Sequence, residues 1–259
     1  MQRGIEWLDH RIRDGVVERS FRIIQVHHVV PGALWLPLAS ASPPPLILLG
    51  HGGSSDKRSR RNVDLAHWFA SHAGFAAVAI DGPYHGDRAI AGQEADWHAR
   101  MAKEGIHVVL DRMTQDWQVT VHALAICGIV DAGRLSYLGT SMGTRFGIPL
   151  IAAMGDQFRC AVLGKFGLRQ ALPAPPELAA SERVVSDCRR ITIPVLFHIQ
   201  WHDELFSRDS QFAIFDALGS KDKELAGYTG GHGDTKPQAI IRWQNFVVQH
   251  LSKHVGSSG

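Results

Sequence analysis

The sequence predicts an α/β fold with one mostly parallel, twisted sheet of about eight strands and helices on both faces. Short continuous apolar runs that end in glycine or polar residues are typical of buried parallel strands. Here they alternate with helical segments along the chain. The 259 residues are 45% hydrophobic and contain no evident repeat or linker. We therefore expect a single domain over residues 1–259, with its core from about residue 20 to residue 251.

The individual elements follow from the period of the apolar residues. Two β-rich, partly alternating stretches predict an antiparallel hairpin at the sheet edge, and six apolar runs predict buried strands. The expected strands are residues 21–27, 32–37, 46–49, 75–80, 134–138, 160–164, 191–200 and 224–228. Helices are expected where apolar residues recur every three or four positions. The expected helices are residues 62–72, 114–129, 145–154, 209–218 and 237–251.

Three segments depart from this alternation. Residues 89–112 form a polar connection that is long enough to be functional. Residues 168–190 carry three prolines and two short apolar pieces, which predicts a small cap-like insertion over one end of the sheet. An insertion this short favours an open pocket. Residues 256–259 read as a flexible tail.

Charge and composition argue against several classes of partner. A net charge of +2 gives no strong field for nucleic acid or a membrane surface. No apolar run reaches the ~18 residues that a membrane helix needs, and the first residues lack the apolar segment of a signal peptide. The three cysteines are widely spaced and odd in number, so they form no disulfide framework. We expect a cytoplasmic protein with no nucleic-acid or membrane partner. The edge hairpin and the last helix are the candidate surfaces for a homodimer.

The sequence predicts no cofactor and no metal. The 15 histidines lack the helical spacing with a carboxylate that zinc sites use. Gly139, Gly143 and Gly147 recur every four residues, which matches neither a dinucleotide-binding fingerprint nor a P-loop.

The stretch Gly139-Thr140-Ser141-Met142-Gly143 lies between an expected strand and an expected helix. G-x-S-x-G at such a turn is the nucleophile-elbow pattern, in which the serine hydroxyl is exposed at the end of the sheet. The glycines allow strand and helix to approach closely. The helix N-terminus would stabilise negative charge beside Ser141.

A serine hydroxyl becomes a nucleophile only beside a base, and an imidazole base needs an orienting carboxylate. Asp203 and His232 each follow an expected strand. Because the carboxyl ends of parallel strands share one edge of the sheet, both side chains are expected near Ser141. Glu204 is the alternative acid, and Asp234 is expected to cap the last helix.

From about residue 20 to residue 251 the sequence resembles the α/β-hydrolase superfamily. The resemblance rests on the G-x-S-x-G stretch, on His51-Gly52-Gly53, on Asp203 and on Gly231-His232. Asp81-Gly82-Pro83-Tyr84-His85-Gly86-Asp87-Arg88 further resembles the D-x-P-x-H-G-x-R stretch of bacterial esterases near the dienelactone-hydrolase and prolyl-oligopeptidase branches. Dienelactone hydrolases commonly carry a cysteine nucleophile, whereas this chain carries a serine.

The resemblance implies that Ser141 is the nucleophile, His232 the general base and Asp203 its orienting acid. It also implies an oxyanion hole made by the backbone N–H of Met142 and that of Gly53, with Gly52 as the alternative. His51 is expected to shape this loop by hydrogen bonds.

The predicted function is that of a carboxylesterase-like serine hydrolase, which cleaves esters of small to medium carboxylic acids. The same triad also serves thioester, C–C and peptide cleavage, and a non-catalytic binding protein on this scaffold is the third hypothesis. For His85 and Asp87 we favour a loop-fixing network over a chemical role. Trp97 and Trp201 are candidate walls of an acyl pocket.

Overall fold

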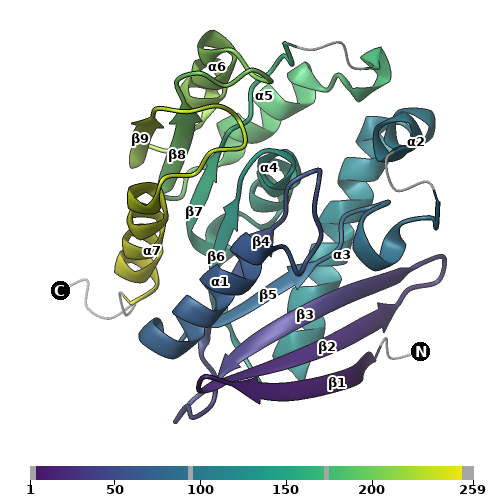
Figure 1. The fold of residues 1–259 in the computed structure, drawn as a ribbon, viewed down its shortest axis with the longest axis vertical. Coiled ribbons are helices and arrows are strands. Elements are labelled where there is room, and N and C mark those ends of the chain that lie inside the picture. The colour runs from purple at the N-terminus through teal and green to yellow at the C-terminus, as the bar shows by residue number, and fades with distance from the viewer. Residues whose placement is uncertain (1–3, 93–95, 172–174, 253–259) are drawn as a thin grey trace.

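The computed structural model describes residues 4–92, 96–171 and 175–252, and its centre is one nine-stranded sheet (Figure 1). The strands are β1 (Ile5–Arg13), β2 (Val16–Ile24), β3 (Val29–Pro37), β4 (Pro45–Gly50), β5 (Ala76–Ile80), β6 (Asp131–Gly139), β7 (Phe158–Gly164), β8 (Val195–Gln200) and β9 (Lys223–Tyr228). Their order in the sheet is β1-β2-β3-β5-β4-β6-β7-β8-β9. β1, β2, β3 and β5 pair antiparallel, and every pairing from β5 to β9 is parallel. The predicted α/β class with a mostly parallel sheet is confirmed, with one strand more than expected.

Helices cover both faces of the sheet. They are α1 (Arg60–Trp68), α2 (Trp97–Glu104), α3 (Ile106–Ile126), α4 (Met142–Met154), α5 (Ser181–Arg190), α6 (Arg208–Ala217) and α7 (Pro237–Leu251). One apolar cluster joins the sheet to α1 and α7, and the other joins it to α3, α4, α5 and α6. Figure 1 shows α1 in front of the central strands.

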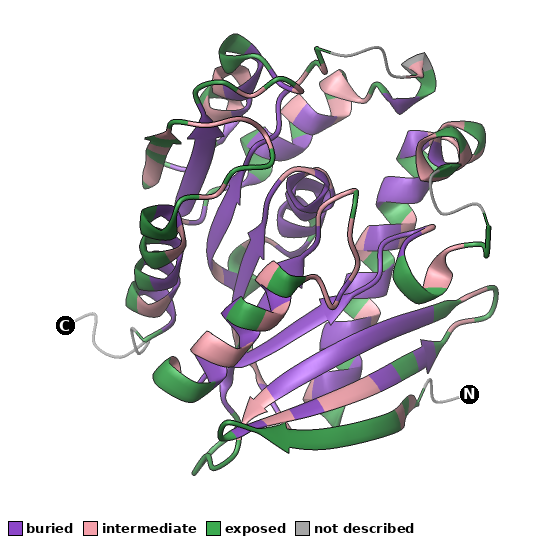
Figure 2. Ribbon diagram, in the orientation of Figure 1, coloured by how far each residue is buried: buried purple, intermediate pink, exposed green. Residues whose placement is uncertain are grey.

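The central strands are buried on both faces because successive side chains point to opposite sides of a sheet. In β4, Leu46 and Leu48 belong to the cluster of α3 and α4, whereas Ile47 and Leu49 belong to the cluster of α1 and α7. This explains why β4 reads as a continuous apolar run rather than an alternating one. Figure 2 shows the central strands and much of α4 buried, while β1 is largely exposed.

Two elements differ from the sequence-based expectation. β1 was not expected, because as an exposed edge strand it presents no buried alternating face. The long helix α3 begins at Ile106, inside the stretch predicted as a polar connection, and α2 precedes it there. Ile106, Val109, Leu110 and Met113 are buried at helical spacing, so the signal for α3 was present in the sequence.

The stretch 168–190, predicted as an insertion, is partly regular. Its last ten residues form α5, which supplies the crossover that a parallel connection from β7 to β8 requires. The residues before α5 lie beside the pocket described below. The predicted tail at 256–259 lies outside the described residues. No helix in the described part of the chain is both long and apolar enough to span a bilayer.

Candidate active site

Ser141 lies at the turn between β6 and α4, with φ 60° and ψ −122°. A positive φ is strained for a residue with a side chain, and this turn holds it in place. Glycine is required on both sides, since a Cβ on Gly139 would lie 3.0 Å from the Gly143 carbonyl oxygen. A Cβ on Gly143 would lie 2.9 Å from that of Gly50. Helix α4 begins at Met142, the residue directly after Ser141.

The buried ring of Tyr137 fixes how α4 sits on the sheet. Its hydroxyl donates to the carbonyl of Gly143 at 2.6 Å. A Cβ on Gly147 would lie 2.3 Å from the ring, so this position leaves no room for a side chain. The glycine spacing that matched no nucleotide-binding motif thus serves close packing of α4 on β6.

The structure brings Ser141, His232 and Asp203 together in one hydrogen-bonded chain. The Nε2 atom of His232 lies 2.9 Å from the Oγ atom of Ser141. On the other side of the ring, Nδ1 lies 2.9 Å and 3.1 Å from the two carboxylate oxygens of Asp203. The Asp203 side chain is fully buried, and that of His232 is 14% exposed. This is the arrangement that a serine nucleophile, an imidazole base and an orienting acid require.

Asp203 is held as an acceptor by its own loop. Its Oδ1 atom accepts the backbone N–H groups of Leu205 and Phe206, both at 2.9 Å. Burial raises the pKa of this carboxyl, but the hydrogen bonds from His232 and from the backbone lower it more, so the net pKa lies below its ordinary value. Glu204 instead accepts the backbone N–H of His232 at 2.8 Å and makes no hydrogen bond to the imidazole.

The loop that carries His232 is fixed by residues that sequence reasoning missed. Lys165, which follows β7, donates from Nζ to the carbonyls of His232 and Asp234 and, at 2.8 Å, to the Thr235 hydroxyl. Burial, with a contribution from the charge of Arg61, lowers the pKa of Lys165 to about 8. Lys165 could have been found, because it directly follows the expected strand 160–164, at the same edge of the sheet as Ser141.

Gln200, the last residue of β8, anchors the same loop from a second side. Its Nε2 atom donates to the carbonyls of Gly231 at 3.0 Å and Asp234 at 2.6 Å. The expectation that Asp234 caps the last helix is wrong. Its carboxylate accepts the N–H of Gly231, and the residue before α7 is Lys236.

The backbone N–H groups of Met142, Gly52 and Gly53 have no hydrogen-bond acceptor within the described part of the chain. All three residues line the pocket that contains Ser141. Trp97 packs on Gly53, where a Cβ would lie 2.7 Å from the indole, whereas a Cβ on Gly52 would meet nothing closer than 3.8 Å. Three unused donors beside one serine can together stabilise an oxyanion.

Two histidines hold the loop of Gly52 and Gly53. His51 accepts the Gly82 N–H at Nε2 and lies 2.9 Å from the Gly52 carbonyl at Nδ1. Burial lowers the pKa of His51 to about 3, so the ring is neutral at ordinary pH. His85 lies 2.9 Å from the Gly53 carbonyl. Both rings therefore act on the backbone of this loop.

The D-x-P-x-H-G-x-R stretch is a network of buried polar contacts. The carboxylate of Asp81 accepts the Nζ and the backbone N–H of Lys57, at 2.6 Å and 2.9 Å, and the N–H of Asp87 at 2.9 Å. Lys57 also donates to the Asp87 carboxylate at 2.7 Å. Arg88 bridges the Asp81 carbonyl and the Asp116 carboxylate. Asp87 therefore contacts Lys57 and Asp81 and does not line the pocket of Ser141.

A pocket of about 400 Å³ surrounds Ser141, within the range of small-molecule sites. Trp97 lines it, as predicted, but Trp201 does not line it and packs over Gly227 instead. Three cationic side chains, which sequence reasoning missed, also line this pocket: Arg61, Arg145 and Lys165. Within the described ranges, no three side chains of His, Cys, Asp or Glu are grouped so that they could hold a metal ion.

The comparisons with known proteins agree with this fold. A PEG-bound, cold-adapted esterase from an Arctic intertidal metagenomic library has a TM-score of 0.81 and 28% identity, covering 95% of this chain and 99% of that chain. An acetyl xylan esterase from Paenibacillus sp. R4 has a TM-score of 0.73 and 17% identity, covering 97% and 89%. An S-formylglutathione hydrolase from Agrobacterium tumefaciens has a TM-score of 0.69 and 13% identity, covering 95% and 99%. No family model and no curated protein matches the sequence.

The sheet order, the elbow and these neighbours define an α/β-hydrolase fold. Within it, the chain is similar over 95% of its length to the Arctic esterase. The two neighbours below 25% identity show the fold alone.

Proposed function

We propose that this protein is a carboxylesterase-like serine hydrolase that cleaves esters of small to medium carboxylic acids. The observation that carries the proposal is the contact of 2.9 Å between Ser141 Oγ and His232 Nε2, with Asp203 on the far side of the same ring. The similarity to an esterase at 28% identity favours an ester over a thioester, a C–C bond or a peptide.

The geometry supports a two-step reaction. As Ser141 Oγ attacks the ester carbonyl carbon, His232 Nε2 takes its proton, and the buried Asp203 carboxylate stabilises the imidazolium that forms. The carbonyl oxygen becomes an oxyanion, which the N–H groups of Met142 and Gly53 stabilise. When the tetrahedral intermediate collapses, His232 returns the proton to the leaving alkoxide, so the alcohol leaves and an acyl-enzyme remains.

Water completes the cycle by the same route. His232 takes a proton from the water as its oxygen attacks the acyl carbon, and the proton then returns to Ser141 Oγ as the carboxylic acid leaves. The α4 N-terminus adds a favourable field at the oxyanion. Each preorganised N–H donor at such a site is worth about 3 kcal/mol of barrier.

The test is hydrolysis of p-nitrophenyl acetate and butyrate by the wild type and by Ser141→Ala, with Ser71→Ala as the matched control. Ser71 is exposed, and the hydrogen bonds of its hydroxyl are to the His67 carbonyl and the His72 ring, far along the chain from the elbow. We expect kcat to fall at least about 10⁴-fold in Ser141→Ala and to stay near wild type in Ser71→Ala. A fluorophosphonate probe should label the wild type and not Ser141→Ala. Wild-type turnover or labelling in Ser141→Ala would overturn the proposal.

A further inference from the structure

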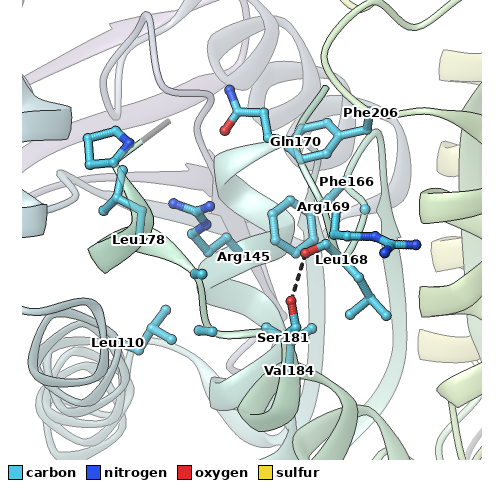
Figure 3. Close-up of a pocket in the computed structure, with 14 residues that line it drawn as sticks. Leu110, Arg145, Phe166, Leu168, Arg169, Gln170, Leu178, Ser181, Val184 and Phe206 are labelled. Carbon is cyan, nitrogen blue, oxygen red and sulfur yellow. Dashed lines mark hydrogen bonds between the residues drawn. The ribbon is translucent and has the colours of Figure 1, made fainter. Parts of the chain in front are cut away.

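The pocket around Ser141 continues into a second pocket of about 280 Å³. Arg145, Phe166, Gln170 and Phe206 line both. The walls of the second pocket are mainly apolar and include Leu110, Leu178 and Val184. Figure 3 shows Arg145 within this pocket, between Leu178 and Phe166. A substrate bound at Ser141 could thus extend past Arg145.

Arg145 lies on α4 four residues after Ser141, one turn along the same helix. Its guanidinium makes no ion pair and no hydrogen bond with any described residue. Its Cζ atom lies 5.5 Å from the centroid of the Phe166 ring. Burial lowers the pKa of Arg145 to about 10, which leaves the side chain charged at neutral pH. The Arg145 side chain is partly buried, and a partly desolvated guanidinium without a counter-ion can pair with an anionic ligand.

The charges around the two pockets have one sign. Among the described residues that line them, none is an aspartate or a glutamate. Arg61 and Lys165 line the first pocket as well. Arg61 donates to the Thr140 hydroxyl at 2.6 Å, while its buried Nε has no partner within the described chain. The field in this cleft therefore favours a negatively charged ligand.

We propose that Arg145 is a specificity-determining residue that binds a carboxylate of the substrate. The preferred substrates are then esters in which a short apolar segment separates the ester group from a carboxylate. A guanidinium matches a carboxylate with two parallel hydrogen bonds. Arg169 also lines the second pocket, but among the cationic side chains described there only Arg145 lines both pockets. Its place between apolar walls suits a carboxylate joined to a hydrocarbon chain. The kinetic part of this inference rests on the proposed esterase function.

The first experiment measures kcat/KM for pairs of charged and neutral esters. Mono-p-nitrophenyl glutarate against p-nitrophenyl pentanoate places the carboxylate on the acyl side. 4-Acetoxybutanoate against butyl acetate places it on the alcohol side. We expect the charged-to-neutral ratio to fall at least tenfold in Arg145→Gln in one of the two pairs, mainly through KM. Arg145→Lys, which keeps the charge but loses the fork, should lie between Arg145→Gln and the wild type.

Arg60→Gln is the matched control. It removes the same charge from a side chain that is 95% exposed on α1, and we expect it to leave both ratios within twofold of the wild type. If Arg145→Gln leaves the ratio unchanged in both pairs, the inference is overturned. An equal fall in Arg60→Gln would also overturn it, because the effect would then be a general field and not a bound carboxylate.

The second experiment needs no turnover. Thermal melts of the wild type, Arg145→Gln and Arg60→Gln are recorded with sodium glutarate and with sodium chloride at equal ionic strength. We expect glutarate to raise Tm in the wild type and in Arg60→Gln, but not in Arg145→Gln. If the esterase proposal fails, this melt still supports or refutes the carboxylate site. An equal glutarate effect in all three proteins, or none in the wild type, refutes it.

Discussion

Asp203→Asn tests whether this carboxylate sets the tautomer of His232. Oδ1 of Asp203 accepts two backbone N–H groups, so the amide oxygen of an asparagine must take that position. Its NH₂ group then takes the place of Oδ2, 2.9 Å from His232 Nδ1. Nδ1 is forced to accept, the ring proton moves to Nε2, and Nε2 can no longer take the proton of Ser141.

The expected loss is large, although the fold is retained. A wrong imidazole tautomer in a serine triad lowers kcat by about 10⁴-fold, which corresponds to about 5 kcal/mol of barrier. The measurement is kcat/KM for p-nitrophenyl acetate at neutral pH, together with the rate of fluorophosphonate labelling. Because the two backbone hydrogen bonds persist, the denaturant midpoint should change little.

Glu204→Gln is the matched control, since an amide oxygen can still accept the backbone N–H of His232. We expect kcat/KM within about threefold of the wild type, the equivalent of a modest change in one hydrogen bond. The reasoning is refuted if Asp203→Asn keeps activity within tenfold of the wild type, or if Glu204→Gln is the more damaging of the two.

Three further outcomes are expected. Gly53→Ala should lower kcat/KM for small esters by about 10²-fold, because the new Cβ would lie 2.7 Å from the Trp97 indole and displace an N–H donor. Asp81→Asn should lower the free energy of unfolding by about 3 kcal/mol in urea titrations, since it leaves the buried Lys57 ammonium without its closest partner. The free energy of unfolding should fall as the pH drops from about 6.5 toward 4. Burial lowers the pKa of His198 to about 4, so the unfolded chain binds a proton that the folded chain does not, at about 1.4 kcal/mol per pH unit.

Each of these outcomes has its own control. Gly52→Ala should be mild, since its Cβ would meet nothing within 3.8 Å, and equal damage at both glycines would contradict the steric argument. Asp64→Asn breaks only an exposed pair and should cost under about 0.5 kcal/mol. His198→Gln should reduce the slope of the acid limb of the stability curve, to which His51 also contributes, and an unchanged slope would rule out a contribution from His198.

Much of the site's position could be predicted because its signals are local. Ser141 lies in a five-residue pattern, and Asp203 and His232 follow apolar runs that could be recognised as strands. Parallel pairing then puts the ends of these strands at one edge without any further information. The choice between Asp203 and Glu204 needed coordinates, since adjacent residues differ only in which way the loop turns them.

The remaining features are not encoded locally. The role proposed for Arg145 depends on the absence of a counter-ion beside its guanidinium. A sequence does not show which acidic side chains fail to reach a given position. β1 is mostly exposed, so its sequence does not show the alternation of apolar and polar residues that a half-buried strand has. By contrast, the spacing of the apolar residues does indicate that α3 starts at Ile106. The polar residues between Ile106 and Met113 made this signal harder to recognise.

Tyr137 packs against Gly143 and Gly147, so the α4 side of the site and the loop that carries His232 should differ in thermal stability. Because α4 is seated on the core of the sheet, the hydrogen-bonded amides of its later turns should exchange only when the fold opens globally. His232 instead stands on a loop held by a few side-chain hydrogen bonds, chiefly from Lys165 and Gln200. On warming, the His232 loop is therefore expected to lose its order while Ser141 is still in place. Activity should then be lost at a lower temperature than that of global unfolding.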